Sequence, residues 1–146
     1  FILTIRDSAD EWYDSLVRFH TKIFSSTSNH PSCDDLRNAD YRYRSWALHA
    51  MQACFDYPRI PMYEPIHYKS VYNLHNNGVQ DYFRSRKDLL AINLKEDDCL
   101  SRLCNFLGFT SADHYEIPHL NQSRWRLHAC NLTFCLTLAT SNLFPP

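Results

Sequence analysis

The chain has 146 residues, enough for one domain with a hydrophobic core, and 45% of them are hydrophobic, which argues against intrinsic disorder. Its 15 lysines and arginines nearly balance its 16 aspartates and glutamates, so the overall charge does not point to nucleic acid or a membrane surface as partner. No apolar run reaches the roughly 18 residues of a membrane-spanning helix, and the composition therefore predicts a packed globular domain.

The first predicted element is a strand, because residues 1–5 read FILTI and only Thr4 among them is polar. Near-continuous apolar runs are typical of strands that are buried on both faces of a parallel sheet. Ser8 and Glu11 then form the pattern of a capping box, and apolar residues follow at helical spacing. These apolar residues are Trp12, Leu16, Phe19 and Ile23. The start of the chain thus predicts a strand, a short turn and an amphipathic helix.

The middle of the chain predicts two long helices separated by prolines. After a serine-rich loop over residues 25–32, one long amphipathic helix is expected to end before Pro58. Its apolar side would contain Leu36, Tyr43, Trp46, Ala47, Ala50, Met51, Cys54 and Phe55. Residues 58–65 contain three prolines and are expected to form an extended connector. The next predicted helix has the apolar residues Val71, Tyr72, Val79, Tyr82 and Phe83.

Residues 89–94 return to the pattern of a buried strand. Asp97 or Asp98 is expected to cap a following helix, and Gly108 suits the left-handed position at its end. Two strands joined by helices are expected to pair in parallel, with a right-handed crossover. Since two strands are too few to bury both faces of such a sheet, we expect an α/β fold of which this chain is the C-terminal section.

The cysteines and histidines give indications of location and metal binding. Six scattered cysteines without a C-x-x-C pair favour reduced core thiols and a cytoplasmic location. They are Cys33, Cys54, Cys99, Cys104, Cys130 and Cys135. Glycosylation sequons at Asn121 and Asn131 leave the Golgi lumen as the alternative location. Neither His67 with His75 nor His128 with its neighbouring cysteines has a four-ligand spacing, so no metal site is predicted.

The late segment DLLAINLKEDDCLSRLCNFLGF, residues 88–109, is followed by EIPHLN at residues 116–121. This succession resembles the late part of sulfotransferases, in which a strand, an acidic turn, a helix and Phe-Leu-Gly precede a short run containing His and Asn. The segment VYNLHNNGVQDYFRSRKDLL, residues 71–90, is also similar to the helix that leads into the late strand of that family. The resemblance covers residues 1–123 and implies part of a P-loop-type, three-layer α/β fold with parallel strands flanked by helices. Residues 124–146 are left as a tail of uncertain structure.

The resemblance also implies a donor and the residues that hold it. Sulfotransferases use 3'-phosphoadenosine 5'-phosphosulfate as co-substrate, without a metal, and transfer its sulfonate group to a hydroxyl or amine of a small molecule or carbohydrate. Arg6 and Ser15 match the strand-end arginine and the helix serine that hold the 3'-phosphate in that family. A guanidinium offers a planar fork of donors to a phosphate, and a hydroxyl near a helix N-terminus adds another donor.

Two questions about this pair stay open from the sequence. Arg6 could instead form a salt bridge with Asp7 or Asp10, and the Ser15 hydroxyl could bond within its own helix. In addition, Arg6 and Ser15 are nine residues apart, whereas eight is usual in the family. An extra residue in the turn would leave the site intact, but one in the helix would rotate Ser15 by about 100°.

The chain has two glycines, Gly78 and Gly108, and neither belongs to a loop resembling Pro-Lys-Ser-Gly-Thr-Thr, which in sulfotransferases holds the 5'-phosphosulfate. The resemblance places that loop and the general base for the acceptor before residue 1. We therefore expect the chain alone to be incomplete and inactive, and we assign it no catalytic residue. The alternatives are a non-catalytic module with the same fold, or a relative of P-loop nucleotide kinases, which would need magnesium ligands.

Overall fold

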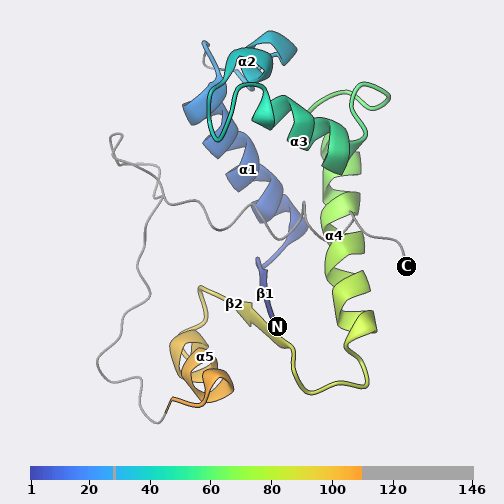
Figure 1. The fold of residues 1–146 in the computed structure, drawn as a ribbon. Helices are drawn as coiled ribbons and strands as arrows, with labels where there is room; N and C mark the ends of the chain where they lie inside the picture. The colour runs from blue at the N-terminus through green and yellow to red at the C-terminus, as the bar shows by residue number, and fades with distance from the viewer. Residues whose placement is uncertain (28, 110–146) are drawn as a thin grey trace.

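The computed structural model describes residues 1–27 and 29–109, which form two strands and five helices (Figure 1). In chain order these are β1 (Ile2–Ile5), α1 (Ala9–Phe24), α2 (Cys33–Asn38), α3 (Trp46–Phe55), α4 (Pro65–Tyr82), β2 (Leu90–Asn93) and α5 (Cys99–Leu107). The predicted tail at residues 124–146 lies outside the described residues, as do the two sequons and the last two cysteines. Within the described part, no helix is both long enough and apolar enough to cross a membrane.

The strands β1 and β2 pair in parallel, as predicted from their apolar runs. The register places Ile2 opposite Leu90 and Ile5 opposite Asn93, so the two strands end at the same edge. Helix α4 packs against β1 and helix α5 against β2. The chain thus has a mixed α/β fold with a parallel sheet flanked by helices, which confirms the predicted fold class.

Several helix ends follow the sequence signals, but Asp98, which precedes α5, makes no side-chain capping hydrogen bond. The Ser8 hydroxyl accepts a hydrogen bond from the Glu11 N–H at 3.1 Å and so caps the first turn of α1. Gly108 ends α5 with a φ of +80°, a left-handed conformation that a residue with a Cβ adopts only with strain. At the start of α4, Pro65 occupies the first turn and Glu64 accepts hydrogen bonds from the next two N–H groups.

The prediction of one long helix ending before Pro58 is wrong, because the predicted helix is interrupted in its middle. The structure has two helices there, α2 and α3, joined by an irregular segment over residues 39–45. Ser45 precedes α3 with a φ of +68°, and its hydroxyl donates a hydrogen bond to the Arg37 carbonyl at 2.7 Å, which closes the segment into a tight loop. Folding back lets Tyr41 pack edge-on against Phe24 of α1, at 5.4 Å between ring centroids. Because this contact joins positions far apart in the sequence, the residues of the segment alone do not predict that the helix breaks there.

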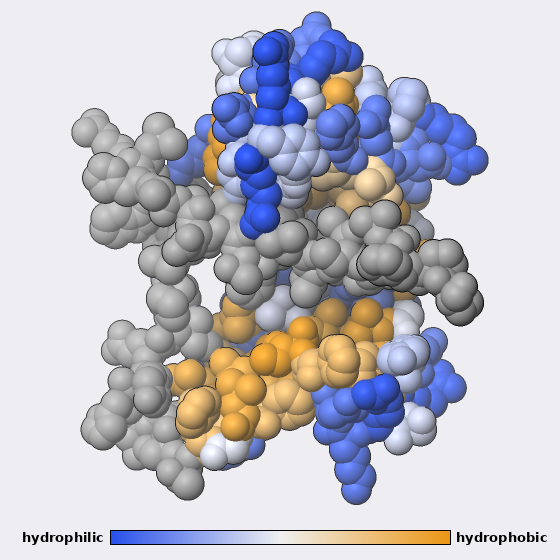
Figure 2. All heavy atoms as spheres, in the orientation of Figure 1, coloured by the Kyte–Doolittle hydropathy of each residue, from blue (hydrophilic) through white to orange (hydrophobic). Residues whose placement is uncertain are grey.

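The described residues fall into two halves. The helical half, residues 9–82, contains a contiguous core in which Leu36 and Tyr68 have no solvent exposure. The sheet half, residues 1–8 and 83–109, is thinner, and Figure 2 shows an apolar surface over it. Its exposed apolar side chains are Phe1, Ile2, Leu107 and Phe109. All four described cysteines are free thiols; Cys99 and Cys104 are buried, and Cys33 and Cys54 are half-buried.

Candidate functional site

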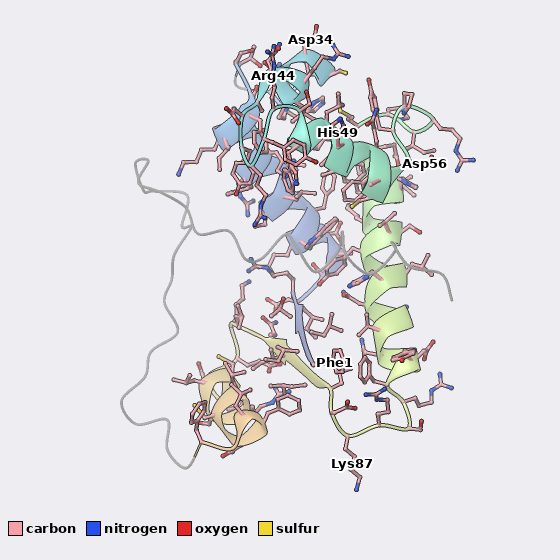
Figure 3. All side chains as sticks on the ribbon, in the orientation of Figure 1. Phe1, Asp34, Arg44, His49, Asp56 and Lys87 are labelled. Carbon is pink, nitrogen blue, oxygen red and sulfur yellow. The ribbon has the colours of Figure 1, made fainter. Side chains whose placement is uncertain are left out.

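The candidate site lies at the edge of the sheet where both strands end. Because β1 and β2 are parallel and in register, Arg6 and Asp7 follow β1 at the same edge at which Asn93 and Lys95 close β2. Open α/β sheets bind their ligands at the carboxyl ends of the strands. Figure 3 shows Phe1 and Lys87 at the opposite end of the sheet.

The backbone of Arg6 is anchored, and its side chain has no partner among the described residues. Its N–H donates a hydrogen bond to the Tyr72 hydroxyl of α4 at 2.8 Å. Tyr72 is itself buried and stacks on Trp12 of α1, with 4.7 Å between ring centroids. The Arg6 guanidinium is exposed and forms no hydrogen bond or ion pair with any described residue. The strand end is therefore anchored to two helices, while its guanidinium stays available to an anion.

Ser15 is the seventh residue of α1 and lies in the second turn, about 9 Å along the axis from the first residue. Its half-buried side chain has no hydrogen-bond partner among the described residues. Ser15 therefore lies beyond the first turn of α1, within which the field of a helix N-terminus falls off. The capping position is occupied by Ser8 instead.

Ser15 nevertheless shares a side of α1 with a residue that faces the strand ends. It follows Glu11 by four residues, and residues four apart lie on the same helix face. Glu11 forms an ion pair with Lys95, which comes from the end of β2. Ser15 is thus one turn farther along the side of α1 that faces this edge of the sheet.

The alternative pairing of Arg6 with nearby carboxylates does not occur. Asp7 forms an ion pair with Lys95, at 3.1 Å between Oδ2 and Nζ, and Asp10 forms one with Lys69 of α4. The intrahelical bond considered for Ser15 is also absent from the described contacts. Both side chains that the sequence proposed for the phosphate are therefore without a protein partner in the described part of the chain.

Sequence reasoning missed a polar network at the same edge of the sheet as Arg6. Asn93 is buried, and its amide donates to the Asp7 carboxylate and accepts from the Lys95 N–H at 3.1 Å. Lys95 then bridges Asp7 and Glu11. Hydrogen bonds from Lys95 and Asn93 hold the pKa of Asp7 below its usual value, and the partners Glu11 and Asp7 raise the pKa of Lys95. A parallel pair places the residues that follow both strands at one edge, but the sequence does not show which of them form ion pairs.

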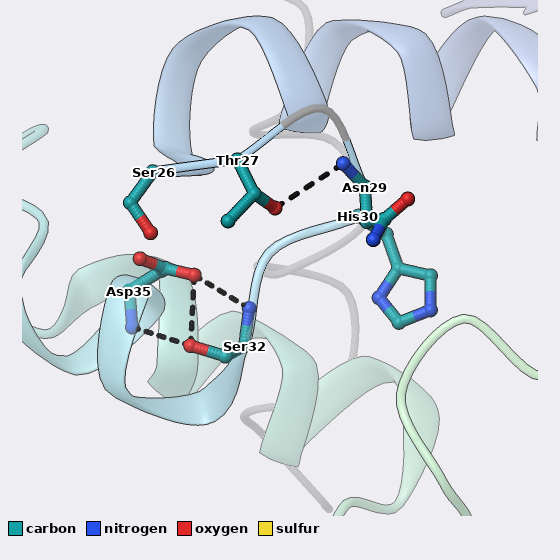
Figure 4. Close-up of a pocket in the computed structure, with 6 residues that line it drawn as sticks. All are labelled: Ser26, Thr27, Asn29, His30, Ser32 and Asp35. Atoms are coloured by element: carbon teal, nitrogen blue, oxygen red, sulfur yellow. Dashed lines mark hydrogen bonds between the residues drawn. The ribbon is translucent and has the colours of Figure 1, made fainter.

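A concave region lies where α1 connects to α2, in the helical half (Figure 4). It is lined by Ser26, Thr27, Asn29, His30, Ser32 and Asp35. Its polar groups are used locally: Asp35 accepts from the Ser32 N–H at 2.8 Å within the capping box of α2, and Thr27 accepts from the Asn29 N–H at 3.2 Å. Among described residues, no group of three or more histidine, cysteine or acidic side chains could hold a metal ion.

Comparison with known proteins yields one match. A family model described as a sulfotransferase domain matches residues 1–125, a span that includes both strands and all five helices. No curated protein and no solved structure matches the chain.

Proposed function

Because this chain belongs to the sulfotransferase domain family, we propose that it serves the transfer of a sulfonate group from 3'-phosphoadenosine 5'-phosphosulfate to an acceptor. The acceptor is a small molecule or carbohydrate that offers a hydroxyl or an amine. The donor supplies a sulfonate on a phosphate leaving group, and the chain supplies groups that hold the donor. We assign residues 1–123 to this domain and treat residues 124–146 as a separate tail.

The residues at the carboxyl end of β1 fit the 3'-phosphate of this donor. The observation that carries the proposal is the Arg6 guanidinium, which is exposed at a strand end and lacks a partner among the described residues. A free guanidinium suits a phosphomonoester because its donors match two phosphate oxygens at once. Ser15, from the side of α1 that carries Glu11, adds a hydroxyl whose hydrogen-bonding capacity is unused within the described residues.

The 5'-phosphosulfate needs a different set of groups. Loops that cradle such groups use successive backbone N–H donors, usually at glycines before a helix. The two glycines of this chain lie within α4 and at the end of α5. We therefore propose that residues 1–146 hold the 3'-phosphate side of the donor, and that they do not catalyse transfer alone. The four free cysteines of the described part favour the cytoplasm as its location.

The proposal is tested by comparing two nucleotides that differ only in the 3'-phosphate. Titration calorimetry on the full-length protein that carries residues 1–146 would measure 3'-phosphoadenosine 5'-phosphate and adenosine 5'-phosphate. We expect Arg6→Ala to weaken the first nucleotide by about 1.5–3 kcal/mol, the range for a hydrogen bond to a charged group. Ser15→Ala should weaken it by less, and neither change should affect adenosine 5'-phosphate.

Arg59→Ala is the matched control, because Arg59 is an exposed arginine whose ion pair with Asp56 lies in the turn after α3. It should leave both affinities unchanged. Equal losses for the two nucleotides in Arg6→Ala would indicate a general loss of structure and contradict the assignment. Failure of the wild-type protein to prefer the 3'-phosphorylated nucleotide would contradict it as well.

A further inference from the structure

Three acidic residues follow Arg6 within five positions of the sequence, and all three form ion pairs with lysines. Asp7 and Glu11 both pair with Lys95, and Asp10 pairs with Lys69. Both lysines come from distant parts of the chain, Lys69 from α4 and Lys95 from the turn after β2. The arginine that stands beside these acids in the sequence has no such pair among described residues.

This distribution of pairs bears directly on whether Arg6 can bind an anion. Partly exposed ion pairs are weak and exchange partners readily, so an unpaired carboxylate close to a guanidinium would compete for it. An unpaired carboxylate would also repel a phosphate that carries nearly two negative charges. Lys95 prevents both effects for Asp7 and Glu11 at once, since its ammonium group contacts both.

The position of Lys95 is set by a buried group. Asn93 is 8% exposed and is the last residue of β2. Both polar atoms of its side-chain amide form hydrogen bonds: Nδ2 donates to Asp7, and Oδ1 accepts from the Lys95 N–H at 3.1 Å. This double use fixes the amide orientation, because the flipped amide would face both partners with the wrong polarity. The turn after β2 is thereby held so that Lys95 returns over the end of β1.

We propose that Lys95 is a positioning residue of the donor site, which holds the Asp7 and Glu11 carboxylates away from Arg6 so that its guanidinium stays open to the 3'-phosphate. The inference rests on the proposed function, since it concerns the same phosphate. It assigns to Lys95 an indirect role: the ammonium group acts on the two carboxylates, and Arg6 contacts the ligand.

The test uses the same two nucleotides and the full-length protein that carries this chain. Lys95→Met should weaken 3'-phosphoadenosine 5'-phosphate by about tenfold, the factor that one hydrogen bond to a charged group corresponds to. The affinity for adenosine 5'-phosphate should stay within about twofold, well below the tenfold that 1.4 kcal/mol represents. Adding Asp7→Asn and Glu11→Gln to Lys95→Met should restore the lost affinity, because the released carboxylates are then neutral.

Lys87→Met is the matched control, because Lys87 is an exposed lysine at the opposite end of the sheet and points away from it (Figure 3). It should change neither affinity. An unfolding midpoint for each variant shows whether the fold is kept. If the triple variant does not regain the affinity, Lys95 contacts the phosphate itself and the positioning role is wrong. No change in Lys95→Met also overturns the inference.

The two proposals fail in different ways. If Arg6→Ala leaves the preference for the 3'-phosphate intact, the proposed site itself is wrong, whatever Lys95 does. If Arg6→Ala removes that preference while Lys95→Met retains it, the site stands and only the role of Lys95 is refuted.

Discussion

The helical half and the sheet half are built on different principles. In the helical half, large side chains pack against one another; Tyr68 is fully buried and stacks on Phe55 with ring centroids 3.9 Å apart and planes within 4°. In the sheet half, Asp7 and Lys95 form an ion pair just beyond the ends of two short strands, and Lys95 also pairs with Glu11 of α1. Apolar side chains are exposed elsewhere in this half. Figures 1 and 2 show the contrast, with the apolar surface in the lower part of the view and α1, α2 and α3 in the upper part.

The comparison teaches where stability and function reside in this chain. Close-packed cores lose several kcal/mol when a large side chain is removed, whereas exposed ion pairs contribute about 0–1 kcal/mol each. Substitutions in the helical half should therefore act on stability. Substitutions at the strand ends should act on ligand binding and leave the fold in place.

The largest expected effect is a loss of stability when a core residue of the helical half is truncated. Tyr68→Ala removes a ring that has no solvent exposure and a hydroxyl that contacts the Met51 sulfur at 3.3 Å. We expect it to lower the free energy of unfolding by about 3–5 kcal/mol, the range for an aromatic residue truncated to alanine in a core. Urea unfolding followed by circular dichroism measures this change.

Leu74→Ala is its control on the same helix, since Leu74 is 73% exposed. It should change the free energy of unfolding by less than about 0.5 kcal/mol, as expected for a surface position. Similar losses in the two variants would show that α4 has no buried face in solution, and the contrast between the two halves would not hold.

Much of this division could be predicted from the sequence. The strands at residues 2–5 and 90–93 follow from their apolar runs, and their parallel pairing follows from the helices between them. Ser8 and Gly108 marked helix ends through local chemistry that acts within a few residues. The break at residues 39–45 could not be predicted, because Tyr41 in this segment packs on Phe24 of α1, a contact that the local sequence does not reveal.

The candidate site, too, could be predicted from the sequence only in part. Arg6 was available from the sequence as a strand-end arginine, and its lack of a described protein partner supports that choice. The bridging role of Lys95 was not available, because its carboxylate partners Asp7 and Glu11 lie more than 80 positions earlier in the chain. Which acid pairs with which base is decided by the fold, since the sequence offers Asp7 several cations within reach.

The next expected effect is on the pH dependence of stability, which should differ between the two halves. His20 is buried in the helical half, and burial lowers its pKa from 6.5 to about 4. Between these values the unfolded chain binds a proton that the folded chain does not, so stability should fall as the pH drops from 6.5 towards 4. The expected loss is about 3 kcal/mol. At the ends of the sheet half, partners lower the pKa values of Asp7 and Asp88 from 3.8, so their contribution should be lost only below that pH.

Urea unfolding at a series of pH values measures both windows. His20→Gln should remove most of the slope between pH 6.5 and 4. It should leave the smaller contribution of His75, whose pKa burial also lowers from 6.5, and the loss below pH 3.8. His49→Gln is the control, because His49 lies exposed on α3 (Figure 3), and it should keep the wild-type slope. A slope in His20→Gln as steep as that of the wild type would contradict the assignment of this window to His20.

The smallest expected effect concerns Ser8, which joins the halves at the start of α1. Ser8→Ala removes the hydroxyl that accepts from the Glu11 N–H and should lower the free energy of unfolding by about 1 kcal/mol. Ser8→Asn is the control, because asparagine caps helices equally well without adding charge beside Arg6. The Asn variant should keep both stability and affinity for the 3'-phosphorylated nucleotide. If it loses as much stability as Ser8→Ala in urea unfolding, the hydroxyl has a role other than capping, and the turn between the halves depends on more than the first turn of α1.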